Sequence, residues 1–412
     1  MRAVAVLNRL LGFEGTVVDD MAFTGTTLVI KVRLRSRALV CPCGRSSQAG
    51  YDRSRRRWRH VDFGRYRVFV EATIRRVDCR GCGRVRSEWM PWARPGARCT
   101  RDFEDLAGWL CKRMPKSAVA TLLRTTWHSV DALVRRLVEA HLDTDRLEGL
   151  YRIGVDEIAY RKGRKFLTVV TDHDTGRVVY ISEGHTSATL SAFYDLLGAE
   201  RRARIQAVTM DMARIYREPT REHLPAAAIC FDPFHVIKWT GDALEQARNN
   251  AGRPATPITI ADLTPAQTWR KIRATLRAAA ENLDDVGHAI IAQLRTHHRR
   301  LHRAWQLKEQ LRDLYRVVAP AHAATHLKRW ITAAIRSRIT GFVAIARRLR
   351  HHFTGIINAI HHNLSNSLTE GLNAGIRLIQ RRAHGYADLP NLIEMIYLCH
   401  GGVSTPLPTE TH

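Results

Sequence analysis

Two aspartates of this sequence stand in apolar, strand-like stretches, where a carboxylate is unusual. Asp156 lies within the β-rich run 152–160, and Asp211 lies near the end of the run 205–212. A carboxylate in such a position costs free energy unless it is paired or binds a cation. Both side chains offer oxygen ligands and no Cys or His is required, so the predicted cation is Mg²⁺ or Mn²⁺.

The elements around these aspartates predict how the two are brought together. Seven elements are expected here, in the order strands 152–160, 166–172 and 177–182, helix 187–197, strand 205–212, helix 216–223 and strand 227–231. The first three strands are joined by tight turns, which indicates antiparallel pairing. This is the order of a ribonuclease-H-like α/β fold, in which the first and fourth strands are neighbours at the centre of the sheet. Asp156 and Asp211 are therefore expected side by side.

A third carboxylate is expected from a helix late in the chain. The segment from about 240 to 363 has helical periodicity throughout and is rich in Arg and His, so it interrupts the α/β fold before its last helix. That last helix is predicted within 363–377, where Glu370 is the only acidic residue. Three carboxylates on one face can hold two divalent cations about 4 Å apart, which clamp the attacking and leaving oxygens of a phosphoryl transfer.

Four cysteines have the spacing of ligands for one zinc ion. Cys79 and Cys82 form a Cys-x-x-Cys-Gly knuckle, which presents two thiolates to one metal. The pair Cys41 and Cys43 is one residue shorter than that spacing. We therefore expect a zinc ribbon in the N-terminal, β-rich part of the chain, where a metal can replace the core that so short a segment lacks.

The short first pair leaves two alternatives open. One of its thiolates is replaced by His60 or Cys99, or the two cysteine clusters are unrelated and the module binds no metal. Between the cysteine pairs lies a basic run that we expect to contact DNA, made up of Arg55, Arg56, Arg57, Trp58 and Arg59.

Three short helices are predicted after the Pro-rich break at 90–96, where the apolar period changes from 2 to 3.6. They lie at about 103–110, at 117–123 and from 127 onward, and only a few residues separate the last two. This is helix-turn-helix spacing, in which the second helix of the motif enters a DNA groove; plain helix packing is the alternative. The side chains expected to face DNA are Thr126, His128, Ser129, Arg135 and Arg136.

The chain carries a large positive charge. Its 412 residues include 65 Lys and Arg against 39 Asp and Glu, a formal net charge of +26. An excess this large and this widely spread predicts a polyanionic partner, and nucleic acid is the usual one. No apolar run approaches the roughly 18 residues that a membrane helix needs, and charge interrupts the N-terminus too early for a signal peptide. We therefore expect an intracellular protein with no membrane partner, whose eight cysteines are metal ligands or buried thiols.

Taken in order, these motifs resemble the transposases of the ISL-three family of bacterial insertion sequences. Besides the ribbon and the helix-turn-helix, the resemblance rests on Gly154-Val155-Asp156-Glu157, Thr209-Met210-Asp211-Met212, Phe231-Asp232-Pro233-Phe234-His235, Leu364-Ser365-Asn366 and Glu370-Gly371-Leu372-Asn373. It implies a DDE transposase whose catalytic, metal-binding acids are Asp156, Asp211 and Glu370. The pair Asp232 and His235 resembles an accessory motif of Mutator-like transposases, which makes His235 a further candidate catalytic residue.

The expected fold is a multidomain α/β protein in which a zinc ribbon and a helix-turn-helix precede a ribonuclease-H-like core with an all-helical insertion. The expected segments are 1–95 for the zinc-ribbon module, 96–148 for the helix-turn-helix, 149–240 for the first part of the core, 241–362 for the insertion, 363–402 for the last part of the core and 403–412 for a tail.

The function that follows from the resemblance is binding of the terminal inverted repeats of an insertion sequence, with metal-dependent cleavage and transfer of DNA strands. The implied partners are double-stranded DNA, both repeats and target, and further copies of the chain in a synaptic complex. The implied location is the bacterial cytoplasm, in association with the nucleoid. Two alternatives stay open: a catalytically silent DNA-binding regulator derived from a transposase, and an RNA-processing nuclease on the same fold.

Overall fold

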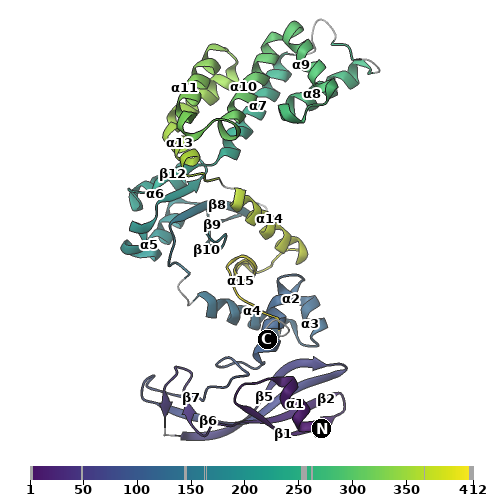
Figure 1. Ribbon diagram of the computed structural model, residues 1–412, viewed down its shortest axis with the longest axis vertical. Coiled ribbons are helices and arrows are strands. Elements are labelled where there is room, and N and C mark those ends of the chain that lie inside the picture. Colours follow the sequence, from purple (N-terminus) through teal and green to yellow (C-terminus); the bar gives the residue numbers. More distant parts are fainter. Residues whose placement is uncertain are drawn as a thin grey trace. The chain divides into compact units, whose positions relative to one another are not determined.

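The computed structural model describes residues 3–47, 50–142, 146–161, 163, 165–251, 258–260, 263–365 and 367–407 (Figure 1). These residues form two units. The first unit contains the chain up to residue 142 together with residues 378–407, and the second contains residues 146–377. The finer division into six segments stays a prediction.

A five-stranded sheet forms the N-terminal part of the first unit. Its strand order is β1-β2-β6-β5, with β7 paired to β6. The elements are α1 (Ala3–Leu11), β1 (Thr16–Thr24), β2 (Thr27–Leu34), β3 (Leu39–Val40), β4 (Ser46–Ser47), β5 (Gly50–Phe63), β6 (Tyr66–Cys79) and β7 (Arg84–Ser87). One face of the sheet packs on a core around Trp58 and Trp92. The alternation of apolar and polar residues at 28–34 predicts β2. The arginine-rich sequence of β5 lacks such an alternation, so it does not indicate a long strand.

The three helices of the predicted helix-turn-helix follow the sheet. They are α2 (Arg101–Cys111), α3 (Lys116–Leu122) and α4 (Trp127–Leu142). The Thr100 side chain accepts a hydrogen bond from the backbone N–H of Phe103 and so caps α2. The buried side of α4 consists of Val130, Asp131, Leu133, Val134, Leu137 and Val138. The apolar residues of α4 thus recur at helical spacing on one buried side.

The C-terminal helix α15 (Leu389–His400) belongs to the same unit as the helix-turn-helix. It packs on α4, where Glu394 forms an ion pair with Arg135 over 3.0 Å. The carbonyl oxygen of Val403 accepts a hydrogen bond of 2.6 Å from the Lys112 ammonium group. The expected core segment 363–402 is thus shared between the two units. Of the expected tail, residues 403–407 are described and residues 408–412 lie outside the described residues.

The sheet of the second unit has five strands, and its first and fourth strands are neighbours. The strand order is β10-β9-β8-β11-β12, with β9 antiparallel to β8 and to β10 and with β11 parallel to β8 and to β12. The elements are β8 (Arg152–Arg161), β9 (Lys165–Asp172), β10 (Val178–Glu183), α5 (Ser187–Arg204), β11 (Ala207–Met210), α6 (Arg214–His223) and β12 (Ala228–Phe231). The first and fourth strands are neighbours, as the sequence order predicts.

The two faces of this sheet differ in chemistry because side chains alternate along a strand. Ile153 and Val155 of β8 belong to the apolar core, together with Leu190 and Phe193 of α5 and Tyr216 of α6. Gly154 and Asp156 alternate with them along β8 and therefore face the opposite side of the sheet. That face is the one approached by the helix α14.

The described elements between β12 and α14 are all helical, in the part of the chain where the insertion is expected. The helices are α7 (Pro233–Ala251), α8 (Pro265–Arg277), α9 (Asp285–His297), α10 (Arg299–Arg316), α11 (Pro320–Arg336), α12 (Thr340–His351), α13 (Phe353–His361) and α14 (Ser367–Arg382), with a 3-10 turn η1 (Ala280–Asn282). The helix α7 leads away from β12 and packs on α10 and α12, and α13 returns to β12 (Figure 1). None of the helices in the described ranges has the length and apolar character that a bilayer crossing requires.

Candidate functional site

Asp156 lies in β8, and Asp211 directly follows the neighbouring parallel strand β11. Residues 207–209 of β11 pair with residues 152–154 of β8. If this register continued for two residues beyond the printed pairs, Asp211 would come opposite Asp156. Asp211 is the first residue after β11, where its carboxylate accepts a hydrogen bond from the backbone N–H of Ala213. A cation between the two strands would therefore meet carboxylates from both.

Asp156 is held in a fixed orientation and is partly buried. Its Oδ1 atom accepts a hydrogen bond of 2.8 Å from the backbone N–H of Glu157, and its Oδ2 atom accepts one of 2.8 Å from Nδ2 of Asn373. Burial raises the pKa of Asp156 to about 6, because the charged form loses hydration. A nearby divalent cation would favour the charged form.

The neighbouring carboxylate of Glu157 does not belong to this group of acids. It follows Asp156 on β8 and so projects to the other face of the sheet, where its Oε2 atom accepts a hydrogen bond of 2.7 Å from the Tyr216 hydroxyl. Burial together with the Glu157 charge raises the pKa of the Tyr216 hydroxyl.

The helix α14 brings the region of the third acid to β8. Thr369 and Asn373, four residues apart on one side of α14, both face the sheet, and the Thr369 hydroxyl lies 3.5 Å from that of Thr171. Glu370 lies in the first turn of this helix. The side chain of Glu370, like the motif residue Asn366, lies outside the described part of the structure. Its role as third ligand stays a prediction.

Gly154 permits the close approach of α14 to the sheet. A Cβ atom at this position would lie 2.7 Å from the Thr171 hydroxyl oxygen and 2.9 Å from that of Thr369. We expect Gly154→Ala to lower the free energy of unfolding of the second unit by about 1–3 kcal/mol, because the overpacked side chains must move. Denaturant unfolding measures this loss. Gly241→Ala on α7, where a Cβ atom would meet nothing within 4 Å, is the matched control, and equal stability of the two variants would contradict the packing argument.

Polar side chains beside Gly154 support the site and are absent from the sequence-based prediction. The Nε2 atom of His173 lies 2.6 Å from the Thr209 hydroxyl, and Thr209 is two residues before Asp211. Residues two apart on a strand share a face, so the alternation pattern could have placed Thr209 beside the acids. No sequence pattern indicates His173, because it reaches the site from the turn after β9.

Asp232 and His235 form a pair close to the acids. Asp232 follows β12 and is only 3% exposed, and its Oδ2 atom lies 3.0 Å from Nδ1 of His235. The hydrogen bond to Asp232 raises the pKa of His235, and the negative charges of Asp211 and Asp156 contribute to the same direction. His235 is therefore within electrostatic reach of the two strand aspartates.

The four predicted zinc ligands come together in the first unit. Their sulfur atoms all lie within 4.8 Å of one another, with 3.8 Å between Cys41 and Cys82 and 3.7 Å between Cys43 and Cys79. Four sulfurs at 2.3 Å from a tetrahedral zinc ion are about 3.8 Å apart. This donor set and geometry fit zinc, and the short Cys41–Cys43 spacing is compatible with it. Among the described residues, this cluster is the one group of three or more potential ligand side chains whose donor atoms lie this close together.

The alternative zinc ligands have other surroundings. The His60 ring Nδ1 lies 2.8 Å from the Thr100 hydroxyl, and burial lowers the pKa of His60 to about 4. Cys99 lies in the loop before α2 and forms a bridge with Arg59 of β5. Burial raises the pKa of its thiol to about 11. Neither belongs to the group of four sulfurs.

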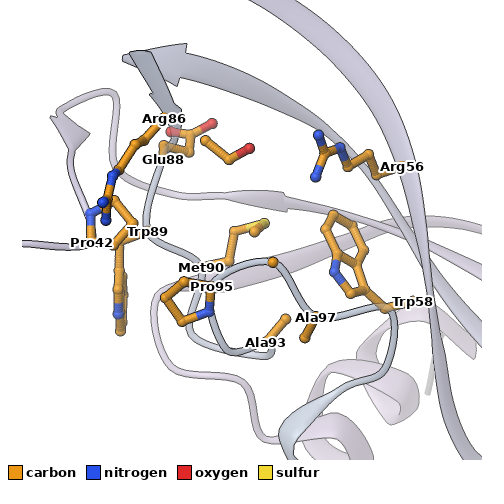
Figure 2. Close-up of a pocket in the computed structure, with 12 residues that line it drawn as sticks. Pro42, Arg56, Trp58, Arg86, Glu88, Trp89, Met90, Ala93, Pro95 and Ala97 are labelled. Carbon is orange, nitrogen blue, oxygen red and sulfur yellow. The ribbon is translucent and has the colours of Figure 1, made fainter. Parts of the chain in front are cut away.

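Trp58 is a correction to the expected DNA-contacting residues. It is 2% exposed and packs edge to face on Trp92, so its side chain belongs to the core of the sheet. Trp58 and Met90 both line a hollow of about 240 Å³. Arg56 and Arg86 line the same hollow from opposite sides (Figure 2). Of these residues, the two arginines are exposed.

The other expected DNA-contacting arginines differ in how they are held. On β5, Arg55 and Arg57 are exposed but share the buried carboxylate of Glu71, and Arg59 is mostly buried against Asp62. On α4, Arg135 pairs with Asp131 and Glu394, and Arg136 pairs with Glu104. Thr126 and Ser129 are exposed at the start of α4, with their hydroxyl oxygens 2.8 Å apart.

A groove of about 970 Å³ lies between the sheet and the helix-turn-helix of the first unit. The start of α4 contributes Thr126, His128 and Ser129 to its lining, and the sheet side contributes Arg67 and Arg98. Both of these arginines are exposed, and neither forms an ion pair with a carboxylate in the described ranges. The sequence does not indicate Arg67 or Arg98 as DNA contacts, because Arg67 lies on β6 and Arg98 in the loop before α2, both outside the helix-turn-helix pattern.

Comparison with known proteins gives one consistent result. Three family models match the chain: a model described as a transposase over residues 153–396, one described as the helix-turn-helix domain of transposase family ISL3 over residues 90–138, and one described as the zinc-finger of transposases IS204, IS1001, IS1096 and IS1165 over residues 37–82. The match over 37–82 supports zinc as the metal of the four cysteines.

Two kinds of curated relative align over nearly the whole chain. The transposase for insertion sequence element IS1557 of Mycobacterium tuberculosis is 36% identical, over 99% of this chain and 98% of its own length. The transposase for insertion sequence element IS1001 of Bordetella parapertussis is 28% identical, over 93% of this chain and 95% of its own length. These matches do not favour a catalytically silent regulator or an RNA-processing nuclease.

Proposed function

The chain belongs to the ISL3 family of insertion-sequence transposases, and we propose that it cuts and joins DNA at the ends of its element through three carboxylates that bind two divalent cations. The observation that carries this proposal is the position of Asp156 on the strand beside the one that Asp211 follows, under the helix that bears Glu370. In vitro cleavage of DNA that carries the element's own ends, in the presence of Mg²⁺, tests it.

The proposed architecture of the catalytic unit is ribonuclease-H-like. Three antiparallel strands followed by two parallel ones, in the order β10-β9-β8-β11-β12, support this assignment. The helices α7 to α13 separate β12 from α14 in the chain. The helix α14 nevertheless packs against the sheet, so Glu370 is brought back to it although it follows Asp211 by 159 residues.

The residues of the site fit Mg²⁺ or Mn²⁺. The donors are carboxylate oxygens, which hard divalent cations prefer, and a bound cation would offset the burial that raises the pKa of Asp156. Bound cations would stabilise the attacking and leaving oxygens of an in-line displacement. Asp156 and Asp211 would hold them from the sheet and Glu370 from α14. The pair Asp232 and His235 would place beside the acids an imidazole whose pKa the hydrogen bond to Asp232 raises.

The groove of the first unit is the proposed site for the terminal repeats. Residues at the start of a recognition helix contact base edges, while surrounding cations contact phosphates. The residues placed to contact base edges are Thr126, His128 and Ser129. The cations placed to contact phosphates are Arg67 and Arg98. In the synaptic complex we propose that more than one copy of the chain acts, since an element has two ends to be joined.

Arg67→Ala and Arg98→Ala are each expected to weaken binding to DNA of any sequence. Each removes about one phosphate contact, so the slope of the logarithm of the binding constant against the logarithm of salt concentration should become shallower by about one. Fluorescence anisotropy at several salt concentrations measures it. Arg9→Ala, an exposed arginine on α1 outside the groove, is the control. Slopes that are unchanged in both groove variants would place the DNA elsewhere.

These point substitutions are preferable to removal of residues 1–140. The helix α15 packs on α4 and buries Leu392, Met395 and Ile396. Truncation would expose that apolar side, so a loss of end binding would not report on the groove alone.

A further inference from the structure

Asn373 connects the helix of the third acid to the carboxylate of the first. It lies on α14, three residues after Glu370, and is 7% exposed. Its Nδ2 atom donates a hydrogen bond of 2.8 Å to Oδ2 of Asp156, a residue 217 positions earlier in the chain. No role for this residue follows from the three-carboxylate scheme itself.

The position is a poor one for an asparagine on grounds of stability alone. The Oδ1 atom of Asn373 is buried and has no hydrogen-bond partner among the described residues. A buried acceptor without a partner destabilises the folded state, and an apolar side chain at this position would avoid that cost. The benefit of an amide here must therefore lie in its contact with Asp156.

The contact completes the orientation of the Asp156 carboxylate. One oxygen is fixed by the backbone N–H of Glu157 on its own strand, and the other is fixed by Asn373 from α14. Each oxygen accepts one hydrogen bond and keeps a further lone pair for a cation. Hydrogen bonds of this kind orient the carboxylates that bind metals.

We propose that Asn373 is a positioning residue that aims the Asp156 carboxylate at the divalent cations and ties the Asp156 strand to the Glu370 helix. This inference rests on the proposed function of the same site. Thr369 contributes to the same docking one turn earlier, beside Gly154, but it touches neither acid in the described contacts. In the described contacts, Asn373 is thus the residue of α14 that links the position of this helix to the orientation of the Asp156 carboxylate.

The test is Asn373→Leu in the full chain, with Mn²⁺ as the probe. We expect Mn²⁺ affinity, measured by calorimetry, to fall about 10–100-fold, and the Mg²⁺ concentration for half-maximal cleavage to rise by a similar factor. The melting temperature shows whether the variant folds, since leucine removes the unpaired acceptor but adds volume at a buried position. The affinity for end DNA should be unchanged.

A matched control is available in the first unit. Asn391 of α15 donates from Nδ2 to Oδ2 of Asp388 over 3.2 Å, and its Oδ1 atom is also buried without a described partner. Asn391→Leu removes the same kind of contact away from the acids, so Mn²⁺ affinity and cleavage should be as in the unaltered protein.

Three outcomes separate the ideas. Unaltered Mn²⁺ affinity in Asn373→Leu would overturn the positioning role while the proposed function stands. Failure of the unaltered protein to bind Mn²⁺ or to cleave end DNA would instead refute the proposed function. If Asn373→Leu does not fold, Asn373→Ala, which adds no volume, carries the same expected loss of affinity; unfolding of both variants would mean that the role of Asn373 is structural and would refute the inference.

Discussion

Asp156→Asn is expected to reduce strand cleavage in Mg²⁺ at least about a hundredfold. The substitution keeps the shape of the side chain but removes a ligand charge where the cations stabilise charge that develops in the transition state. The same loss is expected of Asp211→Asn and Glu370→Gln. Gel assays of cleavage of end DNA measure the rate, and binding to that DNA should be retained because its proposed site lies in the other unit.

Glu157→Gln is the matched control for this prediction. Glu157 is the next residue on β8, but its carboxylate faces the other side of the sheet and accepts from the Tyr216 hydroxyl, a role that a glutamine oxygen can keep. Cleavage by this variant should remain close to that of the unaltered protein.

His235→Ala should slow cleavage less than Asp156→Asn does, because imidazole is not a preferred ligand of a hard cation. Undiminished cleavage by any one of the three acid variants would refute its assignment as a ligand.

Removal of zinc is expected to unfold one end of the sheet in the first unit. The four cysteines are accompanied by a very small apolar cluster, in which Val77 is fully buried and Leu39 partly so. So small a core cannot hold the segment 37–47 on the end of β6 without metal, since structural zinc in small domains supplies about 10–16 kcal/mol of apparent binding free energy. The core around Trp58 and Trp92 is separate from this cluster and should persist.

Elemental analysis should find about one zinc per chain, and chelation should raise amide hydrogen exchange in residues 37–47 and 76–88 but not in the second unit. Cys79→Ser should lose the metal. Cys99→Ser should keep it, because Cys99 lies outside the group of four sulfurs. Purified protein without zinc, or loss of zinc from Cys99→Ser, would contradict the ligand set.

The sequence by itself determined the features that depend on local pattern. Apolar runs of strand length and helical periodicity are short-range signals, and they gave the order of elements around Asp156 and Asp211. The strand order then placed β8 beside β11, which the structure confirms. The Cys79–Cys82 knuckle and the short turn before Trp127 are also local, and the cysteine cluster and the three helices are where they were predicted.

Other features depend on contacts between residues far apart in the chain, and only the tertiary structure decided them. Trp58 lies in an arginine-rich run typical of a surface, yet its position on β5 points it at Trp92 and buries it. The helix α15 follows the last core helix in sequence, but its apolar side packs on α4. The hydrogen bond between Asn373 and Asp156 spans 217 residues. No local pattern encodes such a pair, because it exists only once the helical segment has folded and brought α14 back to the strand that carries the acid.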